Sequence, residues 1–324
     1  MSEPLISILI PCFNAGPWVH RSIETALGQT WPTKEVIVLD DGSTDNSLEI
    51  IRRYEGRVRI ATQANGGANA SRNHLTRLSR GEWLVYLDAD DELALDCVAK
   101  EMEFSGAADV VYATMELATF HGTEKVETQL VPADDYPDPW VAAFHWKFPN
   151  TSSVMFNRRA LLKVGGWDER LKNCTDYELF FKMLLTGVRF KAAPKARTLY
   201  RQWSVTQAVN EAPMRLIRTR LELMWKIANA LTDAGSMTCE RKEAFLNASL
   251  GVIRSIYPSD ARLAKQEHRR LVKWEPAFRP SASFFPQRYV RAYNRVGFVL
   301  AERLASTIRT MKLRTPTQNP RADA

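Results

Sequence analysis

Residues 1–90 alternate short apolar runs with amphipathic stretches, and this rhythm limits the folds that the chain can adopt. Strands are expected at residues 6–10, 36–39, 58–61 and 83–87, and helices at 17–27, 48–54 and 68–78. The expected strands are apolar along most of their length, which is typical of parallel strands buried on both faces. The pattern therefore predicts an α/β fold with a mainly parallel sheet and flanking helices.

Acidic and amide side chains follow these expected strands, at the edge where open α/β sheets bind ligands. The sequence WLVYLDADD at residues 83–91 ends in a group of carboxylates. Asp88 and Asp90 are two positions apart, so in an extended chain their side chains point the same way. Mg²⁺ is commonly held by one or two carboxylates together with phosphate oxygens of a substrate. The segment therefore predicts a site for a divalent cation that carries a phosphate.

Two other loops follow expected strands. Residues 40–45 (DDGSTD) fit a ligand site, but they also fit a capped turn before a helix. Residues 65–73 (NGGANASRN) place two glycines before an expected helix, with Arg72 about one turn inside it. A helix start of this kind can receive an anion, and Arg72 can pair with a phosphate. The alternative is a glycine loop with a solvated arginine.

The sequence TDYE at residues 175–178 opens an apolar helix that is expected to end at Gly187. The spacing of Thr175 and Glu178 is that of a capping box, and Asp176 in the first turn suits the helix dipole. A carboxylate placed at a helix N-terminus can also act as a general base. Capping and catalysis are compatible here.

Composition favours a soluble globular protein, with 45% hydrophobic and 25% charged residues. No apolar run approaches the roughly 20 residues of a membrane-spanning helix, and no signal peptide is expected. The cysteines have no metal-binding spacing, so they are expected to be small core residues in a reducing compartment: Cys12, Cys97, Cys174 and Cys239. These features favour a cytoplasmic location.

Charge is divided unevenly along the chain. Residues 201–324 carry 22 Lys and Arg against 10 Asp and Glu, whereas residues 1–200 carry 22 against 27. Near the end, apolar side chains recur at helical spacing: Tyr289, Val290, Tyr293, Val296, Leu300, Leu304, Ile308 and Met311. This basic amphipathic helix either packs on the rest of the protein with its arginines solvated or lies on an anionic membrane surface. No nucleic-acid-binding module accompanies the charge.

The motifs occur in a fixed order along the chain: SILIPCFN (7–14), SI (22–23), LGQT (27–30), EVIVLDDGSTD (35–45), NGG (65–67), ASRN (70–73), GE (81–82), LDADD (87–91), GGWDE (165–169) and DYEL (176–179). This ordered set resembles the family-2 inverting glycosyltransferases of the nucleotide-sugar-dependent GT-A fold, over about residues 5–205. The resemblance implies a catalytic GT-A domain at residues 1–205. A helical basic region at 206–314 and a disordered tail at 315–324 are expected to follow it.

The resemblance also implies site residues. Asp41 resembles the acid that reads the nucleotide base, and Asp176 the general base, although Thr175 stands where the family usually has Glu. Asp90 is expected to bind the metal, and Asp88 the ribose or the metal. The residues expected to bind the nucleotide-sugar are Pro11, Phe13, Asn14, Asp40, Asp41, Asn65, Gly67, Arg72 and Asp88. Those expected on the acceptor side are Thr151, Ser152, Trp167, Tyr177 and Arg201.

The activity implied is transfer of a sugar from a nucleotide-sugar, with UDP favoured, to a hydroxyl of a glycan or lipid-linked acceptor. Mg²⁺ or Mn²⁺ would neutralise the leaving diphosphate, and no third protein ligand is assigned, because Trp203 stands where some members have histidine. Surface polysaccharide or glycolipid synthesis is the expected setting. Two alternatives stay open: a sugar-nucleotide nucleotidyltransferase, although the first loop (12–16) lacks Lys and Arg, and a catalytically inactive scaffold subunit.

Overall fold

The structure, a computed structural model, describes residues 3–121, 124–203 and 213–314. The chain forms two compact units, Met1–Pro213 and Met214–Ala324. This division lies close to the boundary expected at residue 205. The tail predicted at residues 315–324 lies outside the described residues.

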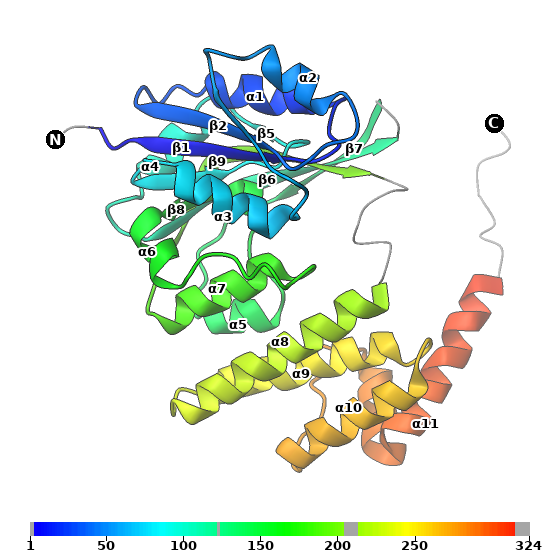
Figure 1. Ribbon diagram of the computed structural model, residues 1–324. Coiled ribbons are helices and arrows are strands. Elements are labelled where there is room, and N and C mark those ends of the chain that lie inside the picture. Colours follow the sequence, from blue (N-terminus) through cyan, green and yellow to red (C-terminus); the bar gives the residue numbers. More distant parts are fainter. Residues whose placement is uncertain (1–2, 122–123, 204–212, 315–324) are drawn as a thin grey trace, which may run out of the picture. The chain divides into compact units, whose positions relative to one another are not determined.

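The first half of the N-terminal unit has the predicted alternation of strands and helices. Its strands are β1 (Ile6–Cys12), β2 (Lys34–Asp40), β3 (Arg59–Thr62) and β4 (Trp83–Tyr86), and its helices are α1 (Val19–Leu27), α2 (Ser47–Arg52) and α3 (Ala68–Leu78) (Figure 1). β1 pairs in parallel with β2 and with β4, and β2 pairs in parallel with β3. The predicted parallel arrangement is confirmed for these strands.

Helices cover both faces of this parallel half. Ile8 and Ile10 of β1 belong to one apolar cluster with Val19 and Ile23 of α1, and all four side chains are fully buried. α3 packs on β1 and β2 from the other face (Figure 1). Burying a Val, Leu or Ile side chain stabilises a fold by roughly 1.5–3 kcal/mol, so the strands form a rigid base for the loops at their carboxyl ends.

The second half of the N-terminal unit is mixed. Its strands are β5 (Glu92–Leu93), β6 (Val110–His121), β7 (Glu124–Val131), β8 (Val154–Asn157) and β9 (Phe190–Trp203). Its helices are α4 (Cys97–Met102), α5 (Pro139–Phe144), the 3₁₀ turn η1 (Thr151–Ser153), α6 (Arg158–Lys163) and α7 (Thr175–Leu185). The sheet order is β3-β2-β1-β4-β8-β6-β9-β5, with β7 beside β6. β8 runs antiparallel to both β4 and β6, and β6 runs parallel to β9.

The long strands β6 and β9 could not be recognised in the sequence, where residues 96–203 have an irregular pattern. Part of β6 pairs with β7, whose described side chains are exposed. β7 therefore lacks the apolar alternation on which sequence-based recognition depends. β6 and β9 have buried residues, but charged residues interrupt their apolar runs, among them Glu116 in β6 and Lys195 in β9.

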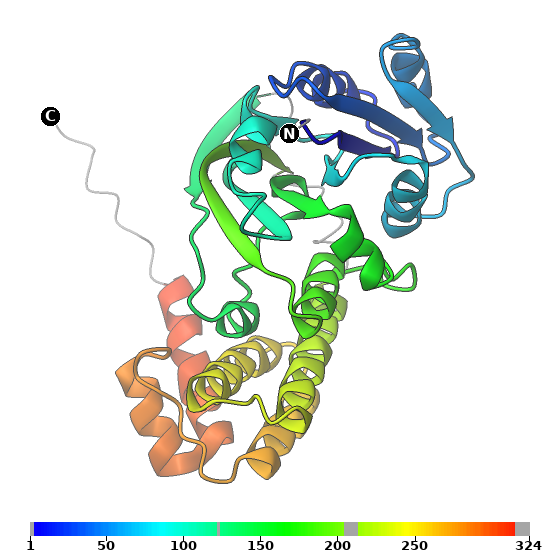
Figure 2. The same cartoon turned by 90° about the vertical axis from the view of Figure 1, so that its left-hand side faces the viewer.

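The described part of the C-terminal unit is helical, as predicted. It consists of α8 (Pro213–Asp233), α9 (Cys239–Ile256), α10 (Ala261–Trp274) and α11 (Gln287–Arg314) (Figure 2). Phe245 of α9 packs edge-to-face on Trp225 of α8, at 4.9 Å, and on Trp274 of α10, at 5.2 Å. Arg254 of α9 pairs with the fully buried Glu302 of α11 at 2.6 Å. Aromatic packing and one buried ion pair thus join these helices.

Helix α11 does not present the single apolar face that its sequence spacing suggests. Gly297, with φ of +75°, interrupts the helix. Tyr289 and Tyr293 are buried, whereas Leu300 and Leu304 are 47% and 56% exposed. The side chains of Ile308 and Met311 lie outside the described residues. In the described parts of the chain, no helix is both long and apolar enough to cross a membrane.

The prediction that the cysteines are core residues is only half correct. Cys12 and Cys97 are buried, but Cys174 is half-buried and Cys239 is exposed. Cys174 immediately precedes α7, and Cys239 is the first residue of α9, so both lie at helix starts and not in the core.

Candidate active site

A solvent-open hollow of about 800 Å³ lies at the carboxyl ends of β1 and β2, beside the N-terminus of α3. It brings together nine of the residues predicted to bind nucleotide-sugar or metal: Pro11, Phe13, Asn14, Asp41, Asn65, Gly67, Arg72, Asp88 and Asp90. Of the predicted donor-binding residues, only Asp40 is not part of the lining. Residues spread over 80 positions of the sequence thus converge on one concave surface, as expected for ligand sites of α/β sheets.

The adjacent acids Asp40 and Asp41 have different roles. Asp41 accepts hydrogen bonds from the backbone N–H groups of Gly66 and Gly67, both at 2.9 Å, and faces the hollow. Asp40 is buried and accepts a hydrogen bond from Ser43 N at 3.2 Å. Gly42, which follows Asp41, has φ of +71° and lies close to the loop at Asn65. A Cβ on Gly42 would approach Asn65 N to 2.9 Å, so a larger residue would clash there. The turn interpretation thus fits Asp40, whereas Asp41 lies at the hollow and its role in ligand binding stays a prediction.

Asn14 and Phe13 form one rim of the hollow. Asn14 has φ of +50° and accepts a hydrogen bond from Thr44 N at 2.8 Å, which ties the end of β1 to the loop after β2. This contact leaves the Phe13 ring 49% exposed at the lining. An exposed aromatic ring beside a polar hollow is suited to stack on a planar ligand group.

Arg72 is a buried cation, not the solvated arginine of the alternative interpretation. Its guanidinium donates to Asp88 Oδ1 at 2.8 Å and lies 4.7 Å from the centre of the Trp167 ring. Burial alone would lower the pKa of Arg72, but the carboxylates of Asp88 and Asp176 outweigh burial and raise it. Arg72 therefore keeps a permanent positive charge between two acids that are distant in the sequence.

The acid group after β4 includes one member that the site predictions left out. Asp91 is fully buried and accepts a hydrogen bond from Arg201 N at 3.0 Å. Burial, followed by the neighbouring carboxylates of Asp90 and Asp88, raises the pKa of Asp91 well above its usual range. This crowding of negative charge would be relieved by a bound cation.

The residues present fit a divalent metal that is shared with a phosphate. Within residues 3–121, 124–203 and 213–314, no three His, Cys, Asp or Glu side chains form a complete metal cage. Asp88 and Asp90 both line the hollow, and two carboxylates with phosphate oxygens suffice for Mg²⁺. Because Arg72 already pairs with Asp88, Asp90 is the better candidate for the metal.

Asp176 is the second residue of α7 and accepts a hydrogen bond from the hydroxyl of Thr151. Burial raises the pKa of Asp176, whereas Arg72 and the Thr151 hydrogen bond act in the opposite direction. The capping-box prediction is wrong: Thr175 is the first helical residue, and Cys174 precedes it with φ of +56° and no side-chain cap. Thr175 therefore does not cap the helix, and Asp176, which is not among the lining residues of the hollow, is near enough to act on the charge of Arg72.

The predicted acceptor-side residues are largely buried in packing. Tyr177 stacks on Trp146 at 3.6 Å, and its hydroxyl accepts a hydrogen bond from Phe148 N. The Arg201 guanidinium lies over the Phe120 ring at 4.5 Å and over the ring of Trp18, a lining residue of the hollow, at 4.9 Å. The predicted acceptor-side residues are not among those that line the hollow, so their contact with an acceptor stays a prediction. Thr151 and Ser152 are also buried, in η1.

Tyr200 and Lys172 were not among the predicted site residues. Burial raises the pKa of the Tyr200 hydroxyl, and four carboxylates act in the same direction: Asp91, Asp88, Asp90 and Asp176. Lys172 Nζ would lie 3.7 Å from a Cβ built on Gly67, at the rim of the hollow. Asn69 of α3 holds the Lys172 loop by donating to the carbonyls of Asp168 and Leu171. No local sequence pattern marks either residue, because the fold alone brings them there.

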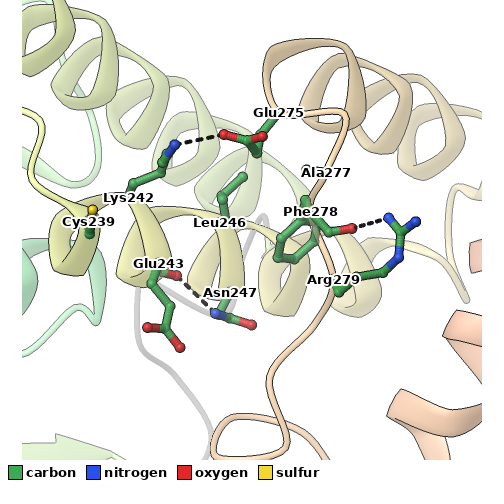
Figure 3. A pocket seen from close by; sticks show the side chains of 9 residues that line it. All are labelled: Cys239, Lys242, Glu243, Leu246, Asn247, Glu275, Ala277, Phe278 and Arg279. Carbon is green, nitrogen blue, oxygen red and sulfur yellow. Dashed lines mark hydrogen bonds and ion pairs between the residues drawn. The ribbon is translucent and has the colours of Figure 1, made fainter.

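A second hollow, of about 300 Å³, lies in the C-terminal unit (Figure 3). Lys242 pairs with Glu275 at 2.8 Å, and Arg279 donates to the Phe278 carbonyl, as the dashed lines show. These cations already have partners within the chain. Two acids line this hollow, Glu243 and Glu275, against three in the first one, Asp41, Asp88 and Asp90.

The fold and the candidate site define an α/β protein with an acidic centre at the strand ends. Residues 7–165 match the model of Glycosyl transferase family 2. The chain is 31% identical over 207 residues to a chondroitin synthase of Pasteurella multocida, a match that covers 58% of this chain and 20% of the relative. The chain thus spans only a fifth of that relative's length.

Solved structures agree on the fold. The S. aureus TarS 1–349 structure in complex with UDP-GlcNAc has a TM-score of 0.62 and 16% identity, and the match covers 98% of this chain and 93% of TarS. The mannosyltransferase PcManGT of Pyrobaculum calidifontis, in complex with GDP-Man and Mn²⁺, has a TM-score of 0.53 and 15% identity, with 97% and 89% covered. Residues 7–165, just under half of the chain, therefore belong to glycosyl transferase family 2, and the fold is of the GT-A type.

Proposed function

We propose that this chain is a metal-dependent inverting glycosyltransferase that moves a sugar from a nucleotide-sugar, with UDP favoured, to a hydroxyl of a glycan or lipid-linked acceptor. The observation that carries the proposal is the gathering of Asp41, Arg72, Asp88 and Asp90 around one hollow, with Asp176 close enough to act on the Arg72 charge. Similar proteins named for UDP-GlcNAc and GDP-Man complexes support a nucleotide-sugar donor. Surface polysaccharide or glycolipid synthesis is the proposed setting.

The chemistry follows from the residue types. Asp41 and the Phe13 ring would hold the nucleoside, and Arg72 would hold negative charge of the donor near Asp88. Mg²⁺ or Mn²⁺ at Asp90 and Asp88 would neutralise charge on the departing diphosphate. Asp176 would take the proton of the acceptor hydroxyl as its oxygen forms the new bond to the anomeric carbon. The bond from that carbon to the diphosphate breaks in the same displacement, so the configuration inverts.

The proposed partner surface is helix α11. Leu300 and Leu304 are exposed on it beside the exposed Arg303, a combination that suits an anionic membrane surface. The protein should co-sediment with vesicles of phosphatidylglycerol and phosphatidylcholine. The double variant Leu300→Glu, Leu304→Glu should stay in the supernatant. Equal retention of the double variant would favour the alternative, in which α11 only packs within the protein.

A thermal-shift screen tests the donor site first. Purified protein is heated with UDP, GDP, CMP or dTDP compounds, with and without Mn²⁺. A ligand present at 100 times its Kd stabilises the folded state by about 2.7 kcal/mol. One class of nucleotide should therefore raise Tm, and the rise should depend on the metal. No shift with any nucleotide, in folded protein, would favour an inactive scaffold. Release of pyrophosphate from a nucleoside triphosphate and a sugar phosphate would instead indicate the nucleotidyltransferase.

A further inference from the structure

The 3₁₀ turn η1 connects the proposed base to the acid pair. Thr151 and Ser152 are 1% and 2% exposed. The Thr151 hydroxyl donates to Asp176 Oδ1 on α7. The Ser152 hydroxyl, one residue later, accepts a hydrogen bond from Asp88 N at 3.2 Å. Adjacent hydroxyls thus reach the two acids from one short segment.

The turn itself is held firmly. Asn150 Oδ1 accepts a hydrogen bond from Ser152 N at 2.8 Å, and Ser153 Oγ donates to Asn150 O at 2.8 Å. The turn leads directly into β8, which pairs with β4 and β6. A turn anchored in the sheet can fix a side-chain hydroxyl to the accuracy that proton transfer requires.

We infer that Thr151 and Ser152 are positioning residues, Thr151 for the proton transfer from the acceptor and Ser152 for the binding of the donor. Thr151 holds Asp176 Oδ1, so that Oδ2 of the same carboxylate takes the proton of the acceptor. Ser152 holds the backbone at Asp88, where the donor and its metal bind. This inference rests on the proposed function, because it needs Asp176 as the base and Asp88 at the donor site.

The test compares Thr151→Val, Ser152→Ala and Ser153→Ala in the full chain. Val matches the shape of Thr without its hydroxyl, and Ser153 is a matched control that bonds only within the turn. The readout is release of nucleoside diphosphate from the sugar nucleotide that the thermal-shift screen identifies. Water is the acceptor, so no glycan has to be known in advance.

Each variant has its own expected signature. Thr151→Val lowers kcat by about 10- to 100-fold, the usual loss for an outer-shell orienting contact, with the donor KM within about twofold. Ser152→Ala raises the donor KM by roughly fivefold, as loss of one hydrogen bond predicts, with a smaller change in kcat. Ser153→Ala leaves both constants within about twofold of the wild type.

Two further variants separate positioning from folding. Thr151→Ser keeps the hydroxyl and restores most of kcat, even if Thr151→Val is poorly folded. In an Asp176→Asn background, Thr151→Val has no further effect, because two residues that act through one group are not additive. An unchanged kcat in Thr151→Val, an additive effect in the double variant, or equal losses in all three single variants would overturn the inference.

Failure of the proposed function gives a different result. Wild-type protein that binds a nucleotide but releases none from a sugar nucleotide, either with water or with glycan acceptors present, would overturn glycosyl transfer, and the positioning role with it. Full turnover in Asp176→Asn would overturn the base assignment, and the role of Thr151 with it, but not glycosyl transfer. Loss of turnover in Asp176→Asn with normal turnover in Thr151→Val would overturn only the role of Thr151.

Discussion

The two units of this chain place their charges in opposite ways. The N-terminal unit, with an excess of acids, buries Asp41 and Asp91 in the loops after β2 and β4, and Arg72 in helix α3. The C-terminal unit is strongly basic, but its one closely paired buried acid is Glu302, which Arg254 neutralises. Desolvating a charge is costly, so several acids gathered beside one hollow indicate a candidate ligand site, whereas a single buried acid paired with an arginine indicates packing.

The largest effect should come from the base. Asp176→Asn keeps the shape of the side chain but removes its ability to take a proton, and turnover should fall by about 10²- to 10⁴-fold. Binding of the donor nucleotide should change little. Initial-rate kinetics and calorimetric titration measure the two effects, with Glu127→Gln on the exposed strand β7 as the control. Turnover of Asp176→Asn near the wild-type rate would show that Asp176 is not the base.

The next effect concerns stability in the helical unit. Arg254→Met leaves the fully buried Glu302 without its ion-pair partner. Breaking a buried pair in this way should lower the free energy of unfolding by about 3–5 kcal/mol. Chemical denaturation measures the loss, while nucleotide affinity should stay unchanged. A changed affinity with normal stability would show that the charge of this unit serves the site.

The pH dependence of folding stability should distinguish the C-terminal unit from the N-terminal unit. Burial lowers the pKa of His268 to about 4, where the ring stacks on Phe298 at 4.2 Å. An unfolded His has a pKa near 6.5, so between these values the unfolded state binds more protons and stability falls as pH falls. Stability is fully present above about pH 6.5 and is lost towards pH 4.

His268→Phe keeps the ring stack and removes the titration. Urea denaturation between pH 4 and pH 7 should therefore show a flatter profile for the variant than for the wild type. The slope that is lost cannot exceed about 1.4 kcal/mol per pH unit for one proton. Parallel profiles for the two proteins would show that His268 does not cause the loss of stability at low pH.

The smallest effect is expected at the rim of the hollow. Lys172 is exposed, and its ammonium group lies close to Gly67. Lys172→Gln should raise the donor KM by roughly twofold to fivefold, since exposed charge pairs are weak. The effect should shrink at high salt because ions screen exposed charges. Lys163→Gln on α6 is a control, and an equal change there would point to overall charge and not to this position.

Much of the site was predictable because its residues follow strands that the sequence marks clearly. Nine predicted ligand-binding residues line the hollow, since strand ends in a parallel sheet meet at one edge. Asp91 and Tyr200 were missed because their importance comes from burial among other acids, which no spacing reveals. The different surroundings of Asp40 and Asp41 were also not predictable, because they depend on which of the two carboxylates faces the loop of Gly66 and Gly67.

The sequence by itself determined the parallel half of the sheet, the helical C-terminal unit and the family, because apolar periodicity and ordered motifs are local properties. Only the tertiary structure decided that Arg72 joins Asp88 to Asp176, that Thr151 holds the proposed base and that α11 divides into a buried and an exposed part. These features depend on contacts between segments that are far apart in the chain. Their energies arise from desolvation and hydrogen bonding at close range, which a linear pattern does not contain.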